Sequence, residues 1–82
     1  MRYPRTPEQW QEAADAAEVL LLVDAARQYG LVRGGPTVDV ARCEEILAGG
    51  RQRGVLPRRA VVENFILDMA AAVSVEDRFE AN

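Results

Sequence analysis

The chain has 82 residues, of which 49% are hydrophobic and 28% are charged, a composition typical of a single globular domain and not of a disordered chain. Its net charge of -3 and its pI of about 4.9 argue against a general nucleic-acid-binding domain, which is usually strongly basic. Histidine is absent and Cys43 is the only cysteine, so the sequence predicts no intramolecular disulfide, no structural zinc site and no cofactor.

A first helix is predicted over residues 7–29. Thr6 is a suitable N-cap, Pro7 fits the first helical position, and Gln9 has the spacing of a capping box. The residues that follow are mostly strong helix formers. Gly30 is a typical C-terminal stop signal, so the helix is expected to end just before it.

A second helix is predicted over residues 38–50, after a loop that contains two glycines and a proline. Either Thr37 or Asp39 can serve as its N-cap. The pair Gly49-Gly50 weakens its end, so we expect it to fray or stop before Gly54.

A third helix is predicted over residues 57–73, with Pro57 near its first position and apolar residues recurring at i, i+3 and i+4. A charged tail, 74–82, follows, in which Ser74 can cap one short last turn. The sequence therefore predicts an all-α fold, a single domain over 1–82 that forms a compact bundle of three helices with a short charged C-terminal tail.

The first helix has an unusual distribution of apolar side chains. At 100° per residue, its early turns gather apolar residues on one side and Glu8, Glu12 and Asp15 on the other. Later apolar residues fall on this acidic side, so the helix becomes apolar almost all round between 19 and 26. Either this helix is central, with the other two covering both sides, or it contacts another molecule; we favour the second explanation because so small a chain covers one face well and a second only in part.

Two further residues need an explanation. Asp24 falls in the apolar sector of the first helix, so we expect a structural ion pair with Arg27, or with Arg42 or an arginine of the 51–59 segment. Cys43 is in phase with apolar neighbours on the second helix, and the acidic residues beside it raise the pKa of a thiol. We therefore expect Cys43 to be a core residue and not a nucleophile.

The leading hypothesis is a non-catalytic protein-interaction module of the adaptor or inhibitor type, which self-associates through the first helix. Leu67 is included among its contacts because it lies outside the apolar sector of the third helix. The candidate interface residues are Trp10, Val19, Leu21, Leu22, Val23, Ala26 and Leu67. The acidic side formed by Glu8, Glu12 and Asp15 is either a docking stripe for a basic partner or a solvated face.

The alternative hypothesis is a small DNA-binding regulator that uses the turn between the second and third helices. Its contacts to an anion or to nucleic acid would be Arg51, Arg53, Arg58 and Arg59. The overall acidity makes nucleic acid the less favoured partner. No motif for an enzyme, a nucleotide or another small-molecule substrate is found.

The sequence also suggests a compartment and an origin. No apolar signal core follows the N-terminus, and the longest apolar run, 19–23, is too short to cross a bilayer. We therefore predict a cytoplasmic protein without a membrane partner, and a lone cysteine fits a reducing compartment. All ten basic residues are arginine, which indicates a GC-rich genome; a bacterial or mobile-element source is one interpretation.

Overall fold

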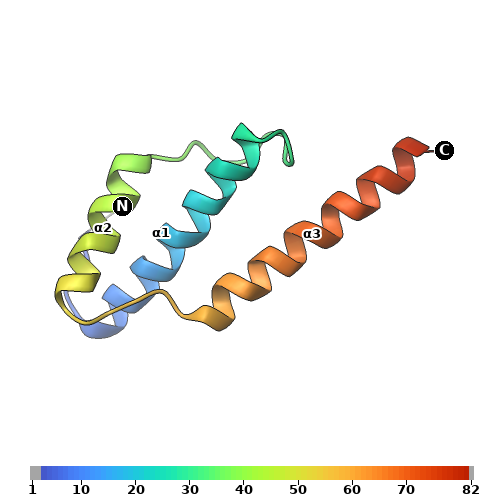
Figure 1. Ribbon diagram of the computed structural model, residues 1–82. Helices are drawn as coiled ribbons and strands as arrows, with labels where there is room; N and C mark the ends of the chain where they lie inside the picture. The colour runs from blue at the N-terminus through green and yellow to red at the C-terminus, as the bar shows by residue number, and fades with distance from the viewer. Residues whose placement is uncertain (1–2, 82) are drawn as a thin grey trace.

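The computed structural model describes the backbone of residues 3–81 and the side chains of residues 3–71. It consists of three α-helices, α1 (Pro7–Gln28), α2 (Val40–Gln52) and α3 (Arg59–Ala81), with no strand in the described part of the chain (Figure 1). The predicted all-α class with three helices is confirmed.

Helix α1 begins and ends at the signals that the sequence carries. Thr6 Oγ1 accepts a hydrogen bond from the Gln9 N–H (3.1 Å), while Gln9 Oε1 accepts one from the Thr6 N–H (3.2 Å), which completes the predicted capping box. Gly30 adopts a φ of 74°, and the Leu31 N–H donates to the Ala26 carbonyl at 2.8 Å. This pattern is a Schellman motif, which satisfies carbonyls that the helix end would otherwise leave unpaired.

Helix α2 begins at Val40, two residues later than predicted, because its N-cap is Asp39 and not Thr37. Asp39 Oδ1 accepts a hydrogen bond from the Arg42 N–H at 3.0 Å. The helix runs through the glycine pair and ends after Gln52. Gly54 then adopts a φ of 73°, which is the left-handed conformation that a C-terminal Schellman motif favours.

Helix α3 is longer than the sequence analysis predicted. It begins at Arg59, two residues after Pro57, and it continues to Ala81 through most of the segment that was expected to be a tail. The reason is that no glycine or proline interrupts Arg59–Ala81, and its alanines and charged residues are favourable in a helix. Asn82, the last residue of the predicted tail, lies outside the described residues.

The three helices are arranged in a row, with α1 in the middle (Figure 1). Helix α2 packs along α1, whereas α3 meets α1 near its own start and then diverges from it. Among the described residues, α2 and α3 do not contact each other. The radius of gyration is 14.6 Å, compared with about 12 Å for a compact chain of this length, and the molecule extends 50 Å along its longest axis.

The core lies between α1 and α2. Its buried centre is made by Ala17, Cys43 and Ile46, against which Leu20, Leu21 and Leu47 pack. Cys43 is therefore a core residue, as predicted. Among the described residues, Ile46 is the only large side chain that is fully buried. Because burying one such side chain contributes only about 1.5–3 kcal/mol, this core gives the isolated chain little hydrophobic stabilisation.

Candidate interaction surface on α1 and α3

A buried carboxylate holds the start of α3 against α1. Asp15 is only 5% exposed, and its two oxygens accept hydrogen bonds from the Arg58 backbone N–H (2.7 Å), Arg58 Nε (2.7 Å) and Gln11 Nε2 (3.0 Å). Gln11 Nε2 also donates to the Leu56 carbonyl at 2.8 Å. We call these four residues, Gln11, Asp15, Leu56 and Arg58, the α3 anchor, because they fix the linker that leads into α3.

The prediction that Asp15 belongs to an exposed docking stripe is wrong. Its partner Arg58 is 43 positions away in the chain, so the local pattern of acidic residues could not reveal the pair. Burial raises the pKa of Asp15, but the hydrogen bonds from Arg58 and Gln11 outweigh burial and leave the pKa lowered overall. Glu8 and Glu12 are exposed, as expected of a solvated acidic face.

The second apolar side of α1 is on the same side of this helix as Asp15 of the α3 anchor. Val19, Leu22 and Ala26 follow Asp15 at the helical spacings that keep residues on one side. The central position of α1 therefore explains why this side is apolar, since α3 starts there. The enclosure is incomplete: Ala26 is buried, but every residue from Val19 to Val23 remains partly exposed.

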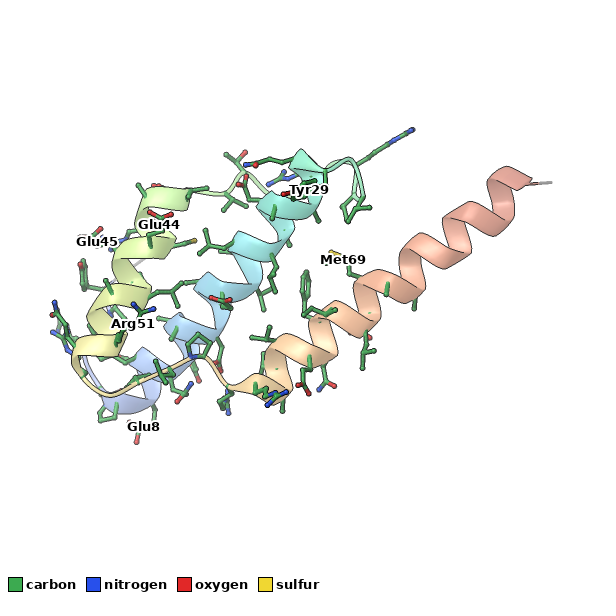
Figure 2. All side chains as sticks on the ribbon, in the orientation of Figure 1. Glu8, Tyr29, Glu44, Glu45, Arg51 and Met69 are labelled. Atoms are coloured by element: carbon green, nitrogen blue, oxygen red, sulfur yellow. The ribbon has the colours of Figure 1, made fainter. Side chains whose placement is uncertain are left out.

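Helix α3 presents a matching set of apolar side chains. Phe65 and Met69 are half-buried, and Figure 2 shows Met69 on the side of α3 that faces α1. Ile66, on the same helical side, is 44% exposed. We call the six partly exposed apolar residues of these two helices the α1–α3 apolar surface: Val19, Leu22, Val23, Phe65, Ile66 and Met69.

Leu67 is exposed but belongs to a different side of α3. It is 66% exposed, which agrees with its predicted position outside the apolar sector. Two positions along a helix turn the side chain by about 200° from Phe65, so Leu67 points away from the α1–α3 apolar surface. Its predicted role as a contact anchor therefore does not extend to this surface.

Two other predicted interface residues, Trp10 and Leu21, pack inside the chain. Trp10 is only 5% exposed, so its predicted role as an exposed anchor is wrong. Its ring lies under the Arg53 guanidinium, 4.2 Å from Cζ to the ring centroid, and makes an edge contact with Tyr3 at 6.1 Å. Leu21 packs against the core between α1 and α2.

The glycine pair in α2 is the reason that Trp10 can be buried. A Cβ atom at Gly49 would lie 2.8 Å from the Trp10 ring, which is too close for van der Waals contact. The indole therefore packs directly on the helix backbone. The local sequence predicts only a weak helix end at these glycines, because Trp10, which packs on them, lies on another helix.

Most of the four predicted anion-binding arginines make contacts within the chain. Arg53 stacks on Trp10, Arg58 belongs to the α3 anchor, and Arg59 Nε pairs with Glu63 Oε1 at 2.6 Å. Arg51 is exposed on α2 (Figure 2). Three of the four guanidinium groups are thus engaged within the chain.

Asp24 does not form the ion pair predicted with Arg27. Its Oδ2 accepts a hydrogen bond from Gln28 Nε2 at 2.9 Å, and its side chain is half-buried. Arg27 Nη1 instead lies 3.4 and 3.5 Å from the carbonyl oxygens of Gly34 and Gly35. The buried carboxylate of α1 is Asp15, which lies on the side of the helix that contacts Arg58 at the start of α3.

Four observations bear on other kinds of site. Burial and then the carboxylates of Asp39, Asp24 and Glu44 raise the pKa of the Cys43 thiol, which makes it a poor nucleophile. The described residues contain no group of three metal-ligating side chains, and within them no helix has the length and apolarity needed to span a membrane. An open hollow of about 780 Å³ beside α1 is lined by Tyr3, Pro4, Arg5, Gln9, Glu12, Ala13 and Ala16.

The sequence matches no protein-family model, and neither curated proteins nor solved structures give a significant match. The candidate surface therefore rests on the geometry of the chain. The predicted site residues omit five members of this region: Gln11 and Leu56 of the α3 anchor, and Phe65, Ile66 and Met69 of the α1–α3 apolar surface. The signal for Ile66 was its position at the rim of the apolar sector of α3, next to the charged side.

Proposed function

We propose that this protein is a non-catalytic helical interaction module that self-associates through the α1–α3 apolar surface. One observation carries the proposal: the apolar sides of α1 and α3 that face each other are only partly covered in the isolated chain, because α3 diverges from α1. Partly exposed apolar residues on two adjoining helices are typical of a protein-binding surface.

The total exposed area supports this proposal. The chain exposes 6148 Å² to solvent, whereas a compact folded monomer of its mass is expected to expose about 4,900 Å². The excess of about 1,200 Å² exceeds the roughly 800 Å² that each partner buries in a standard protein–protein interface. A partner that covers part of the chain would lower this exposed area.

The titratable side chains that the fold buries favour binding over catalysis. The Cys43 thiol is enclosed with a raised pKa, and the Asp15 carboxylate is held in its charged form by three donors with a lowered pKa. Neither group is poised for proton transfer near neutral pH. We propose the cytoplasm as the compartment, because a buried free thiol is compatible with a reducing environment.

The alternative of a DNA-binding regulator gains no support from the geometry. Three of the arginines already contact groups of the same chain: Arg53, Arg58 and Arg59. To bind phosphate they would have to leave these partners, and the free energy lost in doing so would weaken phosphate binding. The net charge of -3 acts in the same direction.

Two neighbouring substitutions test the proposal. Ile66→Glu places a charge on the α1–α3 apolar surface, and Leu67→Glu places the same charge about 100° further round α3, outside that surface. Both side chains are more than one-third exposed, so both variants should fold. Size-exclusion chromatography with light scattering should show a dimeric or larger wild type, a monomeric Ile66→Glu variant and a Leu67→Glu variant like the wild type. A monomeric wild type, or equal behaviour of the two variants, would contradict the proposal.

A further inference from the structure

We infer that the α1–α3 apolar surface is occupied by a second copy of the chain, arranged so that α3 of each copy lies against α1 and α3 of the other. The resulting dimer has a four-helix core made of two α1 and two α3 helices, with each α2 packed outside. This inference rests on the proposed function, for which it supplies the arrangement of the two copies.

The lengths and directions of the helices suit such a core. Helix α1 has 22 residues and α3 has 23, so both are about 33 Å long and can pack along most of their length. Helix α3 meets α1 near its start and diverges towards its C-terminus (Figure 1). A helix of a second copy, related by a two-fold axis, can pack between the diverging ends, as in an antiparallel four-helix bundle.

The chemistry of the surface points to an identical partner. Its six residues are all apolar, and the charged residues Arg59 and Glu63, which border it next to Ile66, pair with each other. An apolar surface of this kind matches another apolar surface, and a two-fold dimer provides one from the same sequence. The excess exposed area of about 1,200 Å² per chain is also sufficient for a standard dimer interface.

The α3 anchor prepares this surface before association. The Arg58 N–H and Nε each hold an Asp15 oxygen at 2.7 Å, at the point where the linker enters α3. The direction in which α3 leaves α1 is therefore fixed by hydrogen bonds that involve a buried charge. A helix already held in its binding direction loses less conformational entropy on association.

An isotope-filtered NMR experiment on a mixture of ¹³C-labelled and unlabelled full-length chains tests the arrangement. It detects only contacts between different copies. We expect intermolecular NOEs from the Met69 methyl and the Phe65 ring to the methyls of Leu22 and Val19. These NOEs should disappear in Ile66→Glu and persist in Leu67→Glu.

Each result decides between the inference and the proposal on which it rests. A dimer by light scattering that lacks these intermolecular NOEs would overturn the four-helix arrangement and leave self-association standing. A chain that remains monomeric at NMR concentrations would overturn both. Intermolecular NOEs confined to the outer side of α3, around Leu67, would overturn the arrangement and relocate the interface.

Discussion

A carboxylate that is removed from water is costly unless donors satisfy its charge, and Asp15 has three of them. Because two of these donors belong to Arg58, which precedes α3, Asp15 determines where α3 joins α1. Helical periodicity pointed instead to Asp24 as the carboxylate in an ion pair, because Asp24 falls in the apolar sector that faces α2. At the residue scale, which acid is buried depends on the contact between Asp15 and Arg58, which are 43 positions apart. Helical periodicity cannot predict such a contact.

The first prediction concerns this ion pair. Asp15→Asn should lower the free energy of unfolding at neutral pH by about 2 kcal/mol, because hydrogen bonds to a charged group contribute about 1.5–3 kcal/mol. The folded-state pKa of Asp15 lies below its usual value of 3.8, so the unfolded state binds the proton first. This stabilisation is present above the usual value and is lost as the pH falls through the folded-state pKa.

Urea unfolding at several pH values measures this effect. The wild type should lose stability on acidification from about pH 5 to pH 2, and Asp15→Asn should lose less over the same range. Glu12→Gln is the control, because Glu12 is exposed one turn earlier on the same helix and its replacement should retain the acid dependence. Parallel pH profiles for the wild type and Asp15→Asn would show that the pair does not stabilise the fold.

The second prediction concerns Gly49. On a bare helix, replacing glycine by alanine would stabilise by about 1 kcal/mol. Here the added Cβ would lie 2.8 Å from the Trp10 ring, so we expect Gly49→Ala to destabilise by about 1–3 kcal/mol, the usual cost of overpacking. In a Trp10→Leu background the obstacle is removed, and the same change should become stabilising. Thermal unfolding of the four chains measures the coupling, and additive effects would contradict the close contact.

At the scale of the helices, the sequence predicted the boundaries where local chemistry decides them. The capping box of Thr6 and Gln9 and the glycine stops at Gly30 and Gly54 involve neighbouring residues only, and the structure contains all of them. The end of α3 was predicted eight residues too early. The charge of this segment suggested a tail, although nothing in its composition stops a helix.

The third prediction distinguishes the two possible N-caps of α2. Asp39 accepts a hydrogen bond from the Arg42 N–H at 3.0 Å, so Asp39→Ala should lower the free energy of unfolding by about 1 kcal/mol. Thr37 lies two residues outside this cap, and Thr37→Ala should have little effect. Chemical denaturation of the two variants measures the difference. A larger loss of stability for Thr37→Ala than for Asp39→Ala would instead indicate that Thr37 is the N-cap of α2.

At the scale of the whole molecule, the sequence predicted the excess of apolar side chains on α1. It did not predict which of them α3 covers and which remain exposed. Val19, Leu22 and Ala26 lie on the side where α3 starts, so part of the excess is explained within the chain. The divergence of α3 from α1 leaves the rest exposed. That divergence depends on the Asp15–Arg58 contact and on the direction of a short linker, neither of which produces a periodic pattern in the sequence.

In one copy of the chain, the α1–α3 apolar surface is only partly covered, and a second copy is needed to cover it. Sedimentation equilibrium of the wild-type protein over a wide range of concentrations tests this requirement most directly. We predict a mass of twice 9.1 kDa at high concentration, which decreases towards the monomer value on dilution. A mass of 9.1 kDa at every concentration would contradict the account.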